Sequence, residues 1–363
     1  MTGETPAAGN EPSWVAKRSR IPGAMSLADV RLDAVHARMR RAVTPDEPTA
    51  TPLFGWLRGH LGWPDGGVDS RAASAKGLRP RVVLVAWAGA GGAMDDTAAI
   101  DVAAAIELTH EFSLVHDDIE DGDRLRRGRP TLWTVVGVPQ AINAGDALFG
   151  IARQVLMHAP VSPAALVAMA RRYDEACVRL AVGQSLDLAF EAADVQHVTP
   201  FDYRGMVRAK TGALLGAAAA LGALGAGGDE DTASTLATWG EHVGTAFQIQ
   251  DDVLGLWGDP AVTGKPVGHD VLRRKKGLPL LLGAVDPTTA DRVQAALTND
   301  ALDEAQAAEL ARALERAGIR DACRHWADRR AADADTALDG LAITADARAA
   351  LRSLSHLAVN RDR

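Results

Sequence analysis

The chain has 363 residues, of which 47% are hydrophobic and 24% are charged, and its formal net charge is −8. This composition is typical of a globular protein, and the length suffices for one large core or two modest domains. The acidic balance excludes a general nucleic-acid binder, which needs a basic surface.

Residues 1–25 are rich in Pro, Gly, Ala, Thr and Glu, and they predict a flexible tail ahead of one domain over residues 26–363. The N-terminus lacks the apolar core of a signal peptide, and the uncharged, Gly- and Ala-rich stretch 212–227 is shorter than the roughly 20 residues that span a bilayer. Cys177 and Cys323 form neither a disulfide framework nor a metal-ligand pattern. We therefore expect a cytoplasmic protein without a transmembrane segment.

Amphipathic helical patterns follow one another from residue 26 almost to the C-terminus. Turn signals separate them at 88–92, 159–163, 198–200, 225–229 and 259–268. Alternating strand patterns are scarce, and the Ala- and Leu-rich composition with only 4% aromatic residues favours helices. The run 82–87 has the composition of a strand but no hairpin signal, and 212–227 predicts a closely packed interior helix. The sequence predicts an all-α fold, a single large helical bundle with a central cavity that facing helices line.

The first cluster of aspartates follows a predicted helix. Residues 100–115 carry apolar residues at helical spacing without Gly or Pro, and the next segment, His116–Pro130, reads HDDIEDGDRLRRGRP. If the helix continues, Asp117 and Asp121 lie one turn apart on one face, with Asp118 beside them.

A second cluster, Asp251 and Asp252 in QDDVLGLWGDPAVTGKP, also follows a helical pattern. Carboxylates near a helix C-terminus oppose the helix dipole, so this placement is costly. Mg²⁺ is held in proteins through one or two carboxylates, with phosphate oxygens and waters as further ligands. Either cluster alone also fits a solvated acidic helix end, but two clusters with basic residues nearby favour a Mg²⁺ and phosphate site.

Further cations occur in separate segments along the chain. They are Lys76 and Arg79 in AKGLRP, Lys210 beside Thr211 in RAKTG, Lys265 in TGKP, and Lys275 or Lys276 in RRKKGLP. Each alone fits a solvated surface residue. Their combination with the aspartates indicates a site for diphosphate groups.

Taken in chain order, eight segments resemble the trans-isoprenyl diphosphate synthase (polyprenyl synthetase) family over roughly residues 50–340. They are AKGLRP, ELTHEFSLVHDDIEDGDRLRRGRPT, NAGDALF, GQSLDL, RAKTGALLGAAAALG, FQIQDDVLG, GDPAVTGKPVGHD and KKGLPL. The resemblance implies an isoprenoid synthase bundle, a homodimer, and head-to-tail condensation of isopentenyl diphosphate with an allylic diphosphate. It also implies dependence on Mg²⁺, with three ions in each substrate-bound site.

The resemblance assigns roles to individual residues. The Mg²⁺ ligands would be Asp117, Asp118, Asp121, Asp251 and Asp252. The allylic diphosphate would contact Arg126, Lys210, Thr211, Gln248 and Lys265, and isopentenyl diphosphate would contact Lys76, Arg79, His110 and Arg127, with Lys275 as a further phosphate contact. His110 also fits a core histidine.

Two positions depart from the family pattern. Gly255 stands where the second acidic motif often has a third Asp. We therefore expect a metal site with fewer carboxylate ligands there, with Asp251 as its main ligand. Ser74 and Ala75 replace a glycine pair ahead of Lys76.

Product length is expected to be set on the helix of the first cluster, where one turn rises about 5.4 Å, close to one isoprene unit. Phe112 and Ser113, five and four residues before Asp117, resemble the arrangement in geranylgeranyl diphosphate synthases. This predicts a C20 product, with C15 farnesyl diphosphate as the nearest alternative; Phe112 also fits plain core packing. Two other functions stay open: a terpene cyclase on the same fold, which needs no isopentenyl diphosphate site, and a non-catalytic regulatory subunit.

Overall fold

A computed structural model describes residues 31–45, 51–63, 77–259 and 267–360. The expected tail, residues 1–25, lies outside the described residues. The long helices are α3 (Leu78–Gly89), α4 (Thr97–Glu120), α6 (Val138–Met157), α7 (Pro163–Ala192), α9 (Ala213–Gly225), α10 (Glu230–Trp257), α15 (Glu304–Arg316), α16 (Ile319–Ala337) and α17 (Ala345–Val359).

Shorter elements connect them. They are α1 (Leu32–Ala42), α2 (Thr51–His60), β1 (Leu125–Arg126), β2 (Arg129–Pro130), α5 (Leu132–Val136), η4 (Val195–His197), α8 (Pro200–Val207), η5 (Arg208–Gly212), α12 (His269–Leu272), α13 (Leu278–Val285) and α14 (Ala290–Thr298). Within the described residues the only sheet is the two-stranded β1–β2 hairpin. The predicted all-α fold is confirmed.

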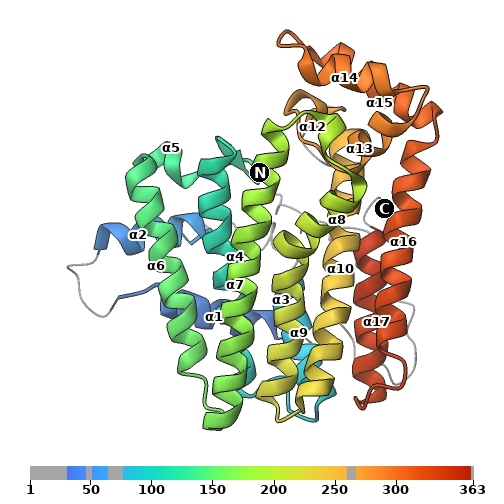
Figure 1. The fold of residues 1–363 in the computed structure, drawn as a ribbon. Coiled ribbons are helices and arrows are strands. Elements are labelled where there is room, and N and C mark those ends of the chain that lie inside the picture. The colour runs from blue at the N-terminus through green and yellow to red at the C-terminus, as the bar shows by residue number, and fades with distance from the viewer. Residues whose placement is uncertain (1–30, 46–50, 64–76, 260–266, 361–363) are drawn as a thin grey trace, which may run out of the picture.

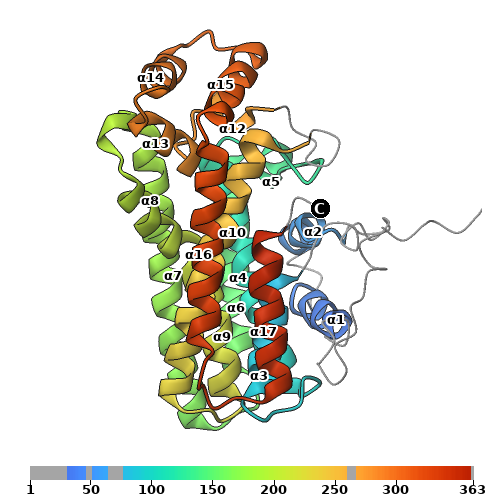
Figure 2. The ribbon, with the colours of Figure 1, turned by 90° about the vertical axis from the view of Figure 1, so that its right-hand side faces the viewer.

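The helices form one elongated bundle (Figures 1 and 2). Helix α9 packs against α3, α7 and α10, while α4 packs on α6 and α10 on α16. Helices α14 and α15 lie at one end of the bundle, at the top of both views. The C-terminal ends of α4 and α10 point toward this same end (Figure 1).

Burial explains the apolar stretches of the sequence. Every residue from Ala213 to Leu224 in α9 is buried, which confirms the predicted interior helix. The run 82–87, which has the composition of a strand, is helical and forms part of α3. Its residues are all buried, as expected for a helix that is apolar on every side. One stretch, Pro200–Gly225, has the length and hydropathy to cross a membrane, but 83% of its window is buried inside the bundle, as in a core helix.

Helix starts follow local sequence signals. Ser162 caps α7 by accepting a hydrogen bond from Ala165 N, with Pro163 at the first helical position. Asp229 caps α10 through Thr232 N at 2.7 Å.

Helix α10 crosses from one apolar cluster to another. Its Trp239 and Val243 belong to the main bundle core. Its Ile249 and Val253 belong to a second core that α8, α13 and α16 share. The polar pair Asp251 and Asp252 therefore lies on α10 where it enters the second core.

Candidate active site

The first aspartates lie where α4 ends. Gly122 adopts φ 65°, Gly122 N donates to Ile119 O, and Asp123 N donates to Asp118 O at 2.9 Å. This pattern of hydrogen bonds is a Schellman motif, which stops the helix and satisfies its last carbonyl groups. Asp117 and Asp118 thus stand in the last turn of α4, with Asp121 as the C-cap residue.

A cavity of about 340 Å³ brings together most of the predicted site residues. Its acidic residues come from α4, α7 and α10, and its cations from α3, the β1–β2 hairpin, η5 and the segment before α13. The predicted residues that line it are Arg79, His110, Ser113, Asp117, Arg126, Arg127, Lys210, Thr211, Gln248, Asp251, Asp252 and Lys275. Lys76 and Lys265 lie outside the described residues.

Lys210 and Thr211 are presented by a π-helical turn, η5, between α8 and α9. Such turns often mark functional sites because they push a segment out of the regular helix. Close packing holds the turn in place: a Cβ on Gly183 of α7 would lie 2.2 Å from Lys210 N, and one on Gly244 of α10 would lie 2.7 Å from Gly212 Cα. Lys210 Nζ donates to Asp187 Oδ2 at 2.6 Å.

Asp252 is held by the protein itself. Tyr203 Oη donates to Asp252 Oδ2 at 2.6 Å, Leu278 N donates to the same oxygen at 3.1 Å, and Gln248 Nε2 donates to Oδ1 at 3.1 Å. Thr211 Oγ1 in turn donates to Gln248 Oε1 at 3.1 Å. Both oxygens of Asp252 thereby join α8, α10 and α13, an arrangement that favours an anchoring role over the expected role as a metal ligand.

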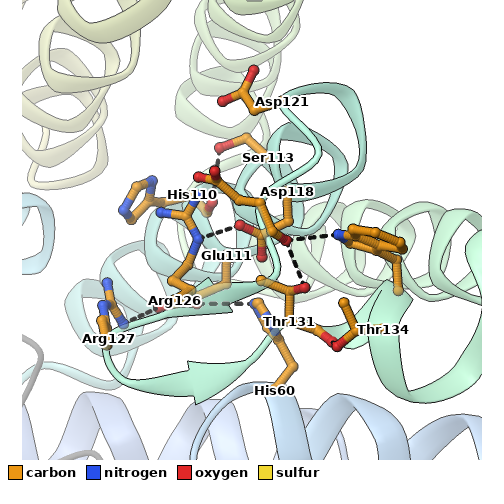
Figure 3. A network of polar contacts seen from close by, with 12 residues as sticks. His60, His110, Glu111, Ser113, Asp118, Asp121, Arg126, Arg127, Thr131 and Thr134 are labelled. Atoms are coloured by element: carbon orange, nitrogen blue, oxygen red, sulfur yellow. Dashed lines mark hydrogen bonds and ion pairs between the residues drawn. The ribbon is translucent and has the colours of Figure 1, made fainter. Parts of the chain in front are cut away.

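Arg126 and Arg127 are set by a tight hairpin. Both loop residues, Arg127 and Gly128, have positive φ, 52° and 74°, which suits the right-handed twist of a two-residue turn. Arg126 Nε donates to Asp118 Oδ1 at 2.6 Å, as Figure 3 shows. Asp118 is 1% exposed, and its Oδ2 has no hydrogen-bond partner among the described residues.

The other face of the hairpin borders a second cavity, of about 810 Å³, that also reaches His60 and Glu111. His60 Nε2 lies 3.2 Å from Glu111 Oε2, and Arg127 Nη1 lies 3.6 Å from Glu111 Oε1 (Figure 3). Burial alone would raise the pKa of Glu111, but His60 and Arg127 hold it well below its usual range. Glu111 is thus a buried anion that fixes Arg127.

Burial, with help from Arg79, holds the pKa of His110 well below its usual range. The imidazole is therefore neutral and can donate one hydrogen bond to an anion without adding charge. Arg79 Nε is buried and has no hydrogen-bond partner among the described residues. Both residues line the main cavity, so they suit an anion bound there.

The aspartates fit a hard cation. Burial raises the pKa of Asp117 to about 6 against the opposing effect of Lys210, and Asp121 raises it further. Burial is also the main cause of the raised pKa of Asp118 and of Asp121. No group of three or more His, Cys, Asp or Glu side chains within the described ranges forms a ready-made metal cage. Mg²⁺ in proteins takes one or two carboxylates and completes its shell with phosphate and water.

In the metal-free protein, the contribution of Asp117 to the free energy of unfolding is expected to fall as the pH rises from about 4 to about 6. In that window folded Asp117 keeps a proton that the unfolded chain releases, so rising pH favours unfolding. Asp117→Asn should remove at most about 3 kcal/mol of this pH dependence. Urea denaturation in EDTA from pH 4 to 8 measures it; equal pH profiles for the two proteins would contradict the assignment.

A third cavity, of about 290 Å³, lies beside Phe112. It shares Ser113, Asp117, Leu180 and Gln184 with the main cavity. Phe112 packs on Phe149 of α6 with ring centroids 5.1 Å apart, and Phe149 stacks at 6.5 Å on Tyr173 of α7. Tyr173 Oη and Thr109 Oγ1 lie 2.8 Å apart. Phe112, Phe149 and Tyr173 thus form a row of aromatic rings that begins at this cavity.

Some site residues were missed in the sequence. Asp187 binds Lys210, Gln184 Nε2 donates to Glu120 Oε2 at 2.8 Å, and Tyr203 binds Asp252. A sequence signal existed for Gln184 and Asp187, which stand three residues apart in GQSLDL on α7. Their partners depend on tertiary packing.

Comparison with known proteins agrees with this geometry. The family model for polyprenyl synthetase matches residues 69–314. A geranylgeranyl diphosphate synthase of Mycobacterium tuberculosis is 42% identical over 296 residues, 81% of this chain and 81% of the relative. A (2E,6E)-farnesyl diphosphate synthase of Mycobacterium bovis is 42% identical over 235 residues, 64% of this chain and 63% of the relative.

Solved structures share the fold. The polyprenyl synthetase from Streptomyces coelicolor A3(2) superposes with a TM-score of 0.82 at 33% identity, covering 90% of this chain and 96% of that one. The geranylgeranyl pyrophosphate synthetase from Pyrococcus horikoshii Ot3 gives 0.80 at 32% identity, covering 92% and 98%. The chain therefore belongs to the polyprenyl synthetase family.

Proposed function

We propose that the chain is a trans-prenyltransferase that condenses isopentenyl diphosphate with an allylic diphosphate to give a short-chain all-trans prenyl diphosphate. The supporting observation is one continuous arrangement. Asp117 and Asp251 line the same cavity as Arg79, Lys210 and Lys275, and Asp117 also lines the cavity beside Phe112. The cavity with the carboxylates and fixed cations and the cavity beside Phe112 thus meet at Asp117.

In this proposal the diphosphate of the allylic substrate lies between α4 and α10. Burial alone would lower the pKa of Lys210, but Asp187 and Asp117 raise it, so Lys210 stays charged. Asp252, with Asp270 and other carboxylates, likewise outweighs burial and keeps the pKa of Lys275 high. Lys276 Nζ donates to Glu191 O at 2.8 Å, which leaves Lys275 as the cation for phosphate. Fixed cations aimed at the leaving group lower the barrier to its departure.

The proposed Mg²⁺ ligands are Asp117 and Asp121 from α4 and Asp251 from α10, together with the Oδ2 atom of Asp118. These residues would hold Mg²⁺, whose positive charge would offset the negative charge that develops on the departing diphosphate. The allylic carbon would lie toward the cavity beside Phe112, which Leu180 and Leu188 also line. After its bond to diphosphate breaks, this carbon would form its new bond with the double bond of isopentenyl diphosphate, and a proton would then be lost.

Arg79, His110 and Arg127 are the proposed contacts for the isopentenyl diphosphate. These residues support a synthase over a terpene cyclase, which uses a single diphosphate substrate. The proposed product is C20 geranylgeranyl diphosphate, supported by Phe112 and by the similarity to the mycobacterial geranylgeranyl diphosphate synthase. C15 farnesyl diphosphate is the nearest alternative.

The deciding experiment is product analysis with Mg²⁺, isopentenyl diphosphate and C5, C10 or C15 allylic starters. We expect C20 prenyl diphosphate from each starter and no product when isopentenyl diphosphate is left out. A hydrocarbon formed from the allylic substrate alone would identify a cyclase. Absence of any product, with a change in the rate of an added synthase, would identify a regulatory subunit.

We further propose that two copies of the chain pair through the outer face of α6 and α7. Val178 and Val182 of α7 are 65% and 50% exposed. The cavity beside Phe112 is also lined by Ala181 and Ser185, exposed residues of this same face, so a second copy would close it. Both cysteines are free, which supports a reducing compartment such as the cytoplasm.

Val178→Glu is expected to convert a dimer into a monomer, because a buried carboxylate without a partner costs several kcal/mol. Sedimentation equilibrium measures the mass. Val285→Glu is the matched control, since Val285 is 67% exposed on α13 at a distant end of the bundle. A dimer that survives Val178→Glu unchanged would place the interface elsewhere.

A further inference from the structure

Glu111 of α4 is a buried carboxylate that interacts with two of the cations proposed to bind isopentenyl diphosphate. It is 3% exposed, and its Oε1 atom lies 3.6 Å from Arg127 Nη1. Burial lowers the pKa of Arg79, and the negative charges of Glu107 and Glu111 act against that effect. Glu111 therefore supplies negative charge to both cations.

The backbone of Arg127 has a conformation that is unusual for this residue type. Its φ of 52° lies in the left-handed region, which residues other than Gly, Asn and Asp rarely adopt. Such a conformation persists where the surrounding structure fixes the residue. Within the described ranges the only ion pair of Arg127 is with Glu111, through Nη1. The guanidinium group keeps further N–H groups with which it can bind a phosphate.

His60, at the end of α2, contacts the other oxygen of Glu111. Its Nε2 atom lies 3.2 Å from Glu111 Oε2, and its side chain is 7% exposed (Figure 3). The same end of α2 also contacts the hairpin, because Arg129 Nη2 donates to Gly59 O. The contacts of His60 with Glu111, of Glu111 with Arg127 and of Arg129 with Gly59 thus join α2, α4 and the hairpin in a closed ring.

We propose that Glu111 and His60 are positioning residues for isopentenyl diphosphate: Glu111 holds the guanidinium group of Arg127 where it lines the main cavity, and His60 orients Glu111. This inference rests on the proposed function. Among the described residues, Glu111 and His60 border the second cavity and do not line the main one. They therefore act through Arg127 and do not touch the substrate.

The allylic diphosphate has separate proposed cations, which contact carboxylates of their own. Arg126 Nε donates to Asp118 Oδ1 at 2.6 Å, and Lys210 Nζ donates to Asp187 Oδ2 at 2.6 Å. Neither contact involves Glu111. Loss of the charge on Glu111 is therefore expected to weaken the binding of isopentenyl diphosphate and to spare the allylic substrate.

Steady-state rates, with each substrate varied while the other is saturating, test this selectivity. Glu111→Gln keeps the size of the side chain and removes its charge. It should raise KM for isopentenyl diphosphate about tenfold or more and leave KM for the allylic substrate within about twofold. His60→Leu should act in the same direction. His60→Gln keeps a nitrogen donor and should stay within about threefold of the wild type.

Asp101→Asn is the matched control, because Asp101 is a 5% exposed carboxylate on the same helix, α4. It accepts a hydrogen bond from Arg38 Nε of α1 at 2.5 Å. The variant loses a buried ion pair that borders neither cavity of the hairpin. Its thermal stability should fall, while both KM values stay within about twofold of the wild type.

Combining two substitutions tests whether His60 acts through Glu111. The double variant His60→Leu with Glu111→Gln should have the same KM for isopentenyl diphosphate as Glu111→Gln alone, to within about twofold. If the two losses multiplied instead, His60 would act independently of Glu111, and its proposed role would be wrong.

Two results would overturn the role of Glu111. One is an equal rise of KM for both substrates in Glu111→Gln. The other is a lower KM for isopentenyl diphosphate, which would mean that Glu111 competes with phosphate for Arg127. If Glu111→Gln does not fold, His60→Leu decides, since an unchanged KM for isopentenyl diphosphate would contradict the proposal.

Calorimetry with isopentenyl diphosphate gives the same comparison without turnover. Glu111→Gln should weaken binding about tenfold, and Asp101→Asn should leave it unchanged. A wild-type protein that binds isopentenyl diphosphate but makes no prenyl diphosphate would defeat the proposed function, and these titrations would still decide the role of Glu111. A wild-type protein that does not bind isopentenyl diphosphate would defeat both proposals.

Discussion

Asp117→Asn is expected to lower kcat/KM for condensation by about 10³-fold, or about 4 kcal/mol of transition-state stabilisation. Asp117 lines both the cavity with the cations and the cavity beside Phe112. It therefore lies where the bond between the diphosphate and the allylic carbon is proposed to break. The amide keeps the size of the side chain but removes the charge that is proposed to hold Mg²⁺. Steady-state rates over a range of Mg²⁺ and substrate concentrations measure the loss.

Asp146→Asn is the matched control for this substitution. Asp146 is a 68% exposed carboxylate on α6, 3.6 Å from His116 and outside the main cavity. Its amide variant should retain activity within about twofold. If Asp117→Asn lost less than tenfold, the first metal site would have to be centred on Asp118 and Asp121 instead.

Phe112→Ala is expected to move the main product from C20 to C25 or longer. Removing the ring opens the cavity along α4, where each turn adds about 5.4 Å, close to one isoprene unit. Phe149 and then Tyr173 follow Phe112 in the row of aromatic rings. Tyr173, whose position the hydrogen bond with Thr109 fixes, would then limit the length of the product. Product chromatography with a C15 starter measures the shift.

Phe201→Ala serves as the control for a lost phenyl ring, because Phe201 is 70% exposed at the start of α8. Its product should stay at C20. The same product from wild type and from Phe112→Ala would remove Phe112 as the barrier and leave it as a packing residue.

The fold and much of the site could be predicted from the sequence, because their signals are local. Helical spacing before Asp117 and Asp251 placed each aspartate in the last turns of a helix, and the structure has them in α4 and α10. The ordered cations of AKGLRP and RAKTG predicted that Arg79 and Lys210 would serve one site, and both line the main cavity.

What the sequence could not predict was which polar groups face one another. Asp251 and Asp252 are adjacent in the sequence and follow the same helical pattern. Asp252 nevertheless accepts a hydrogen bond from Tyr203, which lies 49 residues away in the sequence. Asp270 packs beside Gly255 although the two residues are 15 positions apart, and nothing in the local sequence indicates this contact. Such pairings depend on the packing of whole helices.

The cavity beside Phe112 and the cavity with the cations have only Ser113, Asp117, Leu180 and Gln184 in common among the described lining residues. Variation in Phe112, Cys177 or Leu188 is therefore expected to change the proposed compartment for the hydrocarbon without altering the groups proposed to bind phosphate. With this arrangement, single substitutions, in evolution or in engineering, are expected to change the length of the product while the condensation reaction is retained. The same layout makes Asp117 and Gln184 the positions where altered specificity and lost activity become inseparable.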